Sequence, residues 1–441
     1  MPRTRVAAPL SPASDRRSAD RSAYRPASVA SLAVVGMLAL AGCAPSAPES
    51  TGPPASAGAT EEPEEQSHGF VEGAEELTEA QSSIASIGAD GSVHLLNLLT
   101  AESTDLGSVA DPSWAVSDGR FVFAGAASGP TQIIDTGVWT VPHGDHVHYY
   151  RAAPGTAGEL AESGPARVSS SEGIATLSYA ATGTTVVLDR LSLGQGEMTE
   201  LTRIASSPHA AAAAPVGDAV VASTVDAAGG VPVLTPYSLD GQALGTGLEC
   251  PDLSAVHETS LGATFACSDG LVFAAEPDAE AADATPVLTR VEYPATDGAG
   301  AAPPTSLDSR PHRPAVAGPA GDGGIWLASS RTQELQFIPT PAPTLTAVAV
   351  GDDSNRVIAV DSQGTLLVID GESGEVTGTQ AGLVGTPESA ASIHLSVDTS
   401  RAYLSGTGSS ALHEIDYKDG ARVARTLDLP TAPAFAFETG N

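Results

Sequence analysis

Short apolar runs separated by turn residues follow one another from about residue 84 to the end of the chain. The 3.6-residue apolar period that marks a surface helix is nearly absent from this region. Asp-Gly, Thr-Gly and Gln-Gly pairs separate several of the runs, and such pairs are typical of hairpin turns. The pattern predicts β-hairpins, and we expect the following runs to pair: 84–87 with 93–96, 121–123 with 132–135, 174–177 with 185–189, 264–267 with 271–273, 357–360 with 366–370, and 402–404 with 412–416.

The second run of many pairs ends in an aliphatic residue followed by aspartate, as at Ile369-Asp370 and Ile415-Asp416. With weaker members, eight such units lie between Asn97 and Asp416, a mean spacing of about 46 residues. Strand-rich repeats in the forties are typical of β-propeller blades, which bury their faces only against neighbouring blades. We therefore predict an all-β fold, a seven- or eight-bladed β-propeller over residues 81–441. Two β-sandwiches in tandem are the alternative.

The N-terminal region has the pattern of an export signal. Six arginines and no lysine lie in the first 26 residues, followed by an apolar run over residues 29–40. This run is shorter than the roughly 20 residues that span a bilayer, but it suits a signal-peptide core. It ends in Leu40-Ala41-Gly42-Cys43, which resembles a bacterial lipobox, where the cysteine is acylated and becomes the new N-terminus. We expect residues 1–42 to be a lipoprotein signal peptide and Cys43 to anchor the chain outside the cytoplasmic membrane; a buried helix with an incidental cysteine is the alternative.

Residues 43–80 are rich in Ala, Pro, Ser, Gly, Thr and Glu, and this composition predicts a disordered acidic tether followed by an arm. From Cys43 onward, 14 basic side chains stand against 51 acidic ones, a net charge of −37, with Lys418 the only lysine. The absence of clustered cations excludes a nucleic-acid-binding role. Such acidity keeps an exported protein soluble and concentrates cations near its surface. We expect a monomer.

Two cysteines remain after Cys43. Outside the cell, Cys250 and Cys267 are expected to form a disulfide, which would close a loop of about 17 residues and contribute roughly 3 kcal/mol to stability. With no thiolate left, a metal site in this chain would have to use histidine and carboxylate.

Three of the ten histidines lie within six residues, in His143-Gly144-Asp145-His146-Val147-His148. In an extended strand His146 and His148 point to one side, with their Cα atoms roughly 7 Å apart, a spacing that suits two ligands of one ion. A curl at Gly144 would bring in His143, and Asp145 could ligate or orient an imidazole. This pattern predicts a Zn²⁺ site. A polar loop with chance histidines is the alternative.

Three further residues are weaker metal candidates. His257 and Glu258 are adjacent and lie near the expected disulfide, but a surface turn is the favoured interpretation. His68 could act as a mobile carrier on the arm, but an exposed tail is the favoured interpretation. His312 is followed by Arg313, whose charge disfavours a metal.

The histidine segment resembles the periplasmic zinc metallochaperones of the AztD type. The resemblance covers most of residues 68–441 and includes the following motifs: Ile134-Asp135-Thr136-Gly137-Val138-Trp139, His143-Gly144-Asp145-His146-Val147-His148-Tyr149-Tyr150, Ser207-Pro208-His209, Pro215-Val216-Gly217-Asp218, Cys250-Pro251-Asp252-Leu253 and Ala266-Cys267-Ser268-Asp269-Gly270. It implies a β-propeller that binds Zn²⁺ and passes it to the solute-binding protein of a zinc ABC transporter. It also implies His143, His146, His148 and His209 as ligands. Relatives often have a polar residue after the Pro-His pair, whereas in this chain Pro208-His209 is followed by Ala210 and Ala211.

Loops from different blades converge on one end of a propeller channel, and His209 lies in such a loop, so we expect it to reach the histidine segment. A lone solvated or capped histidine is the alternative. We expect a zinc carrier and no enzyme, because neither a G-x-S-x-G elbow nor a Walker loop occurs. A surface-exposed interaction scaffold and a lactonase-like or dehydrogenase-like propeller enzyme are the alternatives, since the fold alone does not decide function.

Overall fold

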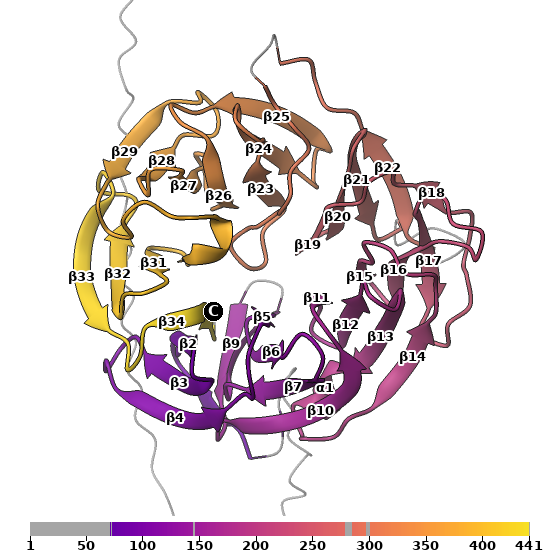
Figure 1. Ribbon diagram of the computed structural model, residues 1–441, viewed down its shortest axis with the longest axis horizontal. Helices are drawn as coiled ribbons and strands as arrows, with labels where there is room; N and C mark the ends of the chain where they lie inside the picture. The colour runs from indigo at the N-terminus through magenta and orange to yellow at the C-terminus, as the bar shows by residue number, and fades with distance from the viewer. Residues whose placement is uncertain (1–70, 72, 144–145, 278–284, 297–299, 441) are drawn as a thin grey trace, which may run out of the picture. The chain divides into compact units, whose positions relative to one another are not determined.

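The computed structural model describes residue 71 and residues 73–143, 146–277, 285–296 and 300–440, with the side chain of His143 left out. Within these residues, eight antiparallel sheets form a ring, and a ninth sheet of three strands is attached to it (Figure 1). The predicted all-β propeller is confirmed, and it has eight blades. No helix in the described part of the chain is long and apolar enough to span a bilayer.

The blades are numbered along the chain, and the strands of each are given from the inside of the ring outward. Blade one contains β34 (Pro433–Thr439), β2 (Ser83–Gly88), β3 (Ser92–Asn97) and β4 (Ser103–Ser108); blade two contains β5 (Trp114–Ser117), β6 (Phe121–Gly125), β7 (Pro130–Asp135) and β10 (Gly155–Ser163); blade three contains β11 (Ala166–Ser170), β12 (Ile174–Tyr179), β13 (Thr184–Asp189) and β14 (Glu200–Ile204); blade four contains β15 (Ala213–Val216), β16 (Ala219–Thr224), β17 (Val233–Ser238) and β18 (Leu248–Glu249).

The second half of the ring follows the same order. Blade five contains β19 (Ala255–Thr259), β20 (Gly262–Cys267), β21 (Gly270–Ala275) and β22 (Val287–Val291); blade six contains β23 (Ala315–Pro319), β24 (Gly324–Ser329) and β25 (Glu334–Pro339); blade seven contains β26 (Thr344–Ala349), β27 (Val357–Asp361), β28 (Leu366–Ile369) and β29 (Val376–Gln380); blade eight contains β30 (Ile393–Val397), β31 (Ala402–Gly406), β32 (Ala411–Asp416) and β33 (Arg422–Asp428). Two short helices, α1 (Arg190–Leu193) and η1 (Ala390–Ser392), lie in connections.

The two ends of the chain close the ring in blade one. The C-terminal strand β34 is the inner strand, and it pairs with β2 from Ser83 opposite Thr439 to Ile87 opposite Phe435. This pairing joins the first and last parts of one circular array, so the alternative of two tandem β-sandwiches is wrong. All six hairpins expected from the apolar pattern are formed.

Blade six has an irregular inner position. Asp308 and Ala317 exchange two backbone hydrogen bonds of 2.8 and 2.9 Å, and the backbone N–H of Ala302 donates to the carbonyl of Ala320. The segment containing Asp308 therefore takes the inner place beside β23 without forming a regular strand. Pro303 and Pro304 lack the backbone donors that a complete ladder requires.

Burial follows strand position within the blade. Every residue of β2, β12 and β20 is buried, whereas most residues of β33 are exposed. The middle strands are covered on both faces by neighbouring blades; for example, Phe121 of blade two and Leu177 of blade three belong to one buried cluster. This two-sided burial explains why the chain shows short continuous apolar runs rather than a strict alternation.

The recurring aspartate after the third strand closes a turn. The Asp370 carboxylate accepts hydrogen bonds from the backbone N–H groups of Ser373 and Glu372, at 2.8 and 3.1 Å, and these bonds lower the pKa of Asp370. Asn97 accepts equivalent bonds in blade one. Asx turns of this kind end the strand by offering the next backbone N–H groups a local acceptor. The repeat seen in the sequence is therefore a repeat of turns.

The ring has two different ends because all inner strands run in the same direction. Turns between inner and second strands, such as 117–120, 170–173 and 259–262, line a cavity at one end. We call this the hairpin end, because the connection from third to outer strand in blade two carries an inserted hairpin there. Turns between second and third strands, and the links from one blade to the next, lie at the opposite end. We call it the disulfide end, because Cys250 and Cys267 are bonded there.

Candidate metal centre

The inserted hairpin consists of β8 (Val138–His143) and β9 (His146–Arg151), which lie between β7 and β10 of blade two. A third strand, β1 (Glu75–Leu77), pairs antiparallel with the other edge of β9. In Figure 1, β9 lies at the inner rim of the ring, between β34 and β5. Residues 139–142 of β8 line the central cavity. The segment that carries the predicted ligands therefore stands at the mouth of the channel.

Buried aromatic and charged groups hold the base of this hairpin. The Trp139 ring stacks on Tyr150 with 5.3 Å between centroids, and the Arg120 guanidinium lies 3.7 Å from the centre of the Trp139 ring. Arg120 also donates two hydrogen bonds, of 3.0 and 2.7 Å, to the Asp135 carboxylate. Thr140 donates to the carbonyl of Gly440 at 3.0 Å. The hairpin is thus fixed to blade two and to the C-terminal end of the ring.

The histidines of β9 lie side by side further along the hairpin. His146 and His148 are two residues apart on one strand, and their ring centroids are 4.8 Å apart. The strand prediction for these two residues is confirmed, and both share a face of the sheet. The backbone register places His143 opposite His146. The side chain of His143, together with Gly144 and Asp145, lies outside the described residues.

A carboxylate that we did not predict from the sequence lies beside these histidines. Glu76 of β1 places Oε1 2.6 Å from Nδ1 of His148. Glu76 is separated from His148 by 72 positions along the chain. The only signal in the sequence is an acidic pair, Glu75-Glu76, in the arm expected at the end of residues 43–80. A three-residue strand is too short to be found from periodicity, so only the fold reveals the contact.

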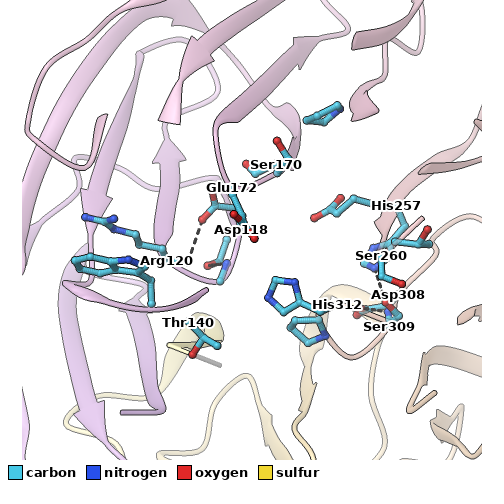
Figure 2. A pocket seen from close by; sticks show the side chains of 18 of the residues that line it. Asp118, Arg120, Thr140, Ser170, Glu172, His257, Ser260, Asp308, Ser309 and His312 are labelled. Carbon is cyan, nitrogen blue, oxygen red and sulfur yellow. Dashed lines mark hydrogen bonds between the residues drawn. The ribbon is translucent and has the colours of Figure 1, made fainter. Parts of the chain in front are cut away.

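The central cavity beneath the hairpin has a volume of about 1480 Å³ and an acidic lining. Figure 2 shows Asp118 and Glu172 on one side of it, with His257 and Asp308 on the other. Burial raises the pKa of Asp308 to about 6, against the opposing effect of the His257 charge. Burial alone would also raise the pKa of Asp118, but Arg190, which donates to it at 2.8 Å, lowers it. Acidic side chains in a cleft raise the local concentration of cations.

Several of the candidate residues occupy this cavity rather than the hairpin. His257 and Glu258 line it from β19, and Nε2 of His257 lies 2.9 Å from Oγ of Ser309. His312 lines it as well, and burial together with nearby arginines, including Arg190 and Arg313, lowers its pKa. The surface-turn interpretation of His257 and Glu258 is replaced by an inner strand, because β19 is the innermost strand of blade five.

His209 lies at the other end of the ring. It belongs to the link from β14 to β15, and such links between blades are at the disulfide end. Nδ1 of His209 lies 2.8 Å from the carbonyl oxygen of Ser207, and Nε2 lies 2.8 Å from Oγ of Ser223. The structure therefore does not bring His209 to the histidine hairpin. The expectation that both loops reach one end overlooked the alternation of turns along an antiparallel blade.

Of the remaining predicted features, the disulfide is confirmed and the others lie in residues that the structure does not describe. Cys250 and Cys267 form the predicted disulfide, with Cα atoms 5.0 Å apart, and it joins the link after blade four to the second strand of blade five. Cys43, His68, the expected signal peptide and the part of the expected tether and arm up to residue 70 lie outside the described residues. Among the side chains that are described, no three His, Cys, Asp or Glu groups are gathered as a metal site would require. The hairpin presents the imidazoles of His146 and His148, and β1 adds the Glu76 carboxylate beside His148. His143 and Asp145 precede these histidines in the chain.

No family model matches the chain, and no curated protein matches it in sequence. Among solved structures, it is similar to apo AztD from Citrobacter koseri, with a TM-score of 0.68, 19% identity, and coverage of 81% of this chain and 97% of that one. A second crystal structure of Citrobacter koseri AztD gives a TM-score of 0.68, 20% identity, and coverage of 82% and 97%. At this level of identity the similarity establishes a shared β-propeller fold.

Proposed function

We propose that this chain is an extracytoplasmic zinc-binding carrier that passes Zn²⁺ to the solute-binding protein of a zinc ABC transporter, and that it is not an enzyme. The observation that carries the proposal is the paired imidazoles of His146 and His148 on an exposed hairpin, with the Glu76 carboxylate in contact with one of them. The AztD-like fold and the motifs of the histidine segment support it.

The chemistry of the hairpin suits zinc as cargo. Imidazole and carboxylate are ordinary zinc ligands, and the disulfide leaves neither Cys250 nor Cys267 as a competing thiolate. His146 is exposed and His148 is half-buried. Ligands at an exposed edge can be replaced one at a time by those of a partner, which a carrier requires. The acidic cavity beneath would attract cations to this end of the ring.

Zinc binding to the paired histidines is tested by equilibrium dialysis with ZnCl₂. We expect His146→Ala combined with His148→Ala to weaken zinc binding roughly 100-fold or more, because two ligands are lost. His413→Ala is the matched control, since His413 lies on β32 of blade eight and contacts Thr426. Equal binding by the double variant and the wild type would overturn the proposed site and favour an interaction scaffold.

Binding to imidazole also predicts a pH dependence. Histidine must be neutral to ligate a metal, so affinity should fall below about pH 6. Transfer is checked by mixing the zinc-loaded chain with a metal-free zinc solute-binding protein and measuring metal on each after separation. Retention of all zinc by this chain would contradict the carrier role while leaving zinc binding intact.

The membrane address is proposed from Cys43 and the residues before it. The exported chain should carry a lipid on Cys43 and partition into the detergent phase of a Triton X-114 separation. Cys43→Ser should move it to the aqueous phase, because the acylated thiol is removed. Mass spectrometry of the N-terminal peptide identifies the lipid, and an unmodified Cys43 in the exported protein would contradict this address.

A further inference from the structure

The contact between Glu76 and His148 joins the arm before the propeller to the histidine hairpin. Glu76 Oε1 lies 2.6 Å from His148 Nδ1, and β1 pairs with β9 so that Glu76 is opposite Tyr150. His148 is two residues before Tyr150 on the same face, so it is the diagonal neighbour of Glu76. Long side chains reach diagonal neighbours across an antiparallel pair. The contact follows from strand register.

The strand that carries Glu76 is fixed by packing of the residues before it and by pairing with β9 along its length. Val71 is buried in one cluster with Trp139, Val141 and Tyr150 of the hairpin. Arg151 donates a hydrogen bond of 2.8 Å to the Glu75 carboxylate. The arm therefore packs on the hairpin base with apolar contacts before β1 and is paired along the strand. Glu76 is placed by this packing.

A carboxylate next to one ring nitrogen decides how an imidazole can bind a metal. A carboxylate that is ionised only accepts hydrogen bonds, so an imidazole that is neutral and makes this contact carries its hydrogen on Nδ1 and its lone pair on Nε2. Carboxylates in contact with ligating histidines fix the tautomer and ring orientation and increase the basicity of the ligand. We propose that Glu76 is the positioning residue of the zinc site, holding His148 so that Nε2 takes the metal. This inference rests on the proposed zinc-carrier function.

Zinc affinity provides the first test, measured by competition with a chromophoric chelator. Glu76→Ala should weaken zinc binding about 10- to 100-fold, the range found when such orienting partners are removed. Glu76→Gln should have an intermediate effect, because the amide oxygen still accepts a hydrogen bond but the charge is lost. Glu75→Ala is the matched control on the same strand, since Glu75 pairs with Arg151 instead. It should change affinity less than about threefold.

The tautomer of His148 provides a second readout that loss of structure alone would not produce. Long-range ¹H–¹⁵N correlation spectra of the metal-free protein near pH 7.5 should show hydrogen on Nδ1 in the wild type and in Glu75→Ala. In Glu76→Ala the population should move toward hydrogen on Nε2. In the zinc-loaded wild type, His148 should coordinate through Nε2.

The outcomes distinguish the proposed role of Glu76 from the proposed zinc-carrier function. Zinc coordination through Nδ1 of His148, or Glu76→Ala matching Glu75→Ala in affinity and tautomer, overturns the role of Glu76 and leaves the carrier function standing. If the wild type and the His146, His148 double variant bind zinc equally, the proposed site fails, and the role of Glu76 fails with it.

Discussion

The hairpin end and the disulfide end of the ring are built from the same strands but differ in what their connections contain. At the hairpin end, the β8–β9 insertion and α1 enlarge the connections, and an acidic cavity opens between the inner turns. At the disulfide end, Cys250 and Cys267 cross-link two connections, and both ring nitrogens of His209 contact neighbouring oxygens. The first end carries His146 and His148 of the proposed zinc site, and the second holds a disulfide and a histidine whose ring contacts the surrounding fold. A histidine in this chain is therefore interpretable only once its end of the blade is known.

The largest expected effect concerns the base of the hairpin. Arg120→Met should lower the free energy of unfolding by about 3–5 kcal/mol, because it leaves the Asp135 carboxylate buried without its partner. It should also weaken zinc binding. Loss of the cation over the Trp139 ring loosens the base of the hairpin that carries His146 and His148. Guanidinium unfolding and zinc competition measure the two effects. Arg151→Met removes an exposed ion pair on the same hairpin and should cost less than about 1 kcal/mol.

The disulfide should contribute to the stability of the fold but not to its zinc affinity. Replacing both Cys250 and Cys267 by alanine should cost roughly 3 kcal/mol, because a covalent loop with a sequence separation of 17 no longer restricts the unfolded chain. Zinc affinity should be unchanged, since the bridge is at the opposite end from the hairpin. Denaturant unfolding and zinc competition at a temperature where both proteins are folded provide the measurement. A weakened zinc affinity would show that the two ends are coupled.

Asp308, which lines the cavity at the hairpin end, should make the stability of the folded chain depend on pH. Burial raises its pKa from 3.8 to about 6, so between these values the folded chain holds a proton that the unfolded chain has released. The stability contribution of this protonation is complete below about pH 4 and is lost as pH rises through 6. Asp308→Asn should therefore stabilise the chain by about 1–2 kcal/mol more at pH 7.5 than at pH 4.5. Thermal unfolding at both pH values tests this, with exposed Asp322→Asn expected to show no such difference.

The smallest effect is expected for His209, and it compares the two ends most directly. His209→Ala should change zinc affinity less than twofold, because its ring contacts Ser207 and Ser223 away from the hairpin. It should cost about 1 kcal/mol of stability through the lost hydrogen bonds. Isothermal titration with zinc checks the first value and denaturant unfolding the second. A loss of zinc stoichiometry in this variant would return His209 to the ligand set.

Much of the fold was predictable because it is encoded locally. Middle strands buried on both faces require short apolar runs, and Asp370 or Asn97 after a strand marks an Asx turn. The disulfide partners followed from cysteine parity, and the shared side of His146 and His148 followed from strand periodicity. The exact number of blades could not be predicted from the sequence. The segment around Asp308 fills an inner strand position with few backbone pairs and without a strand-like sequence pattern.

The sequence by itself determined the kind of element, its turns and the chemistry available in the histidine segment, because these depend on neighbouring residues. The tertiary structure decided which end of the ring each connection reaches, and so separated His209 from His148. It also placed Glu76 against His148 across 72 positions of chain. Strand direction and the pairing of distant strands are set by the closure of the whole ring, and no local pattern of residues carries that information.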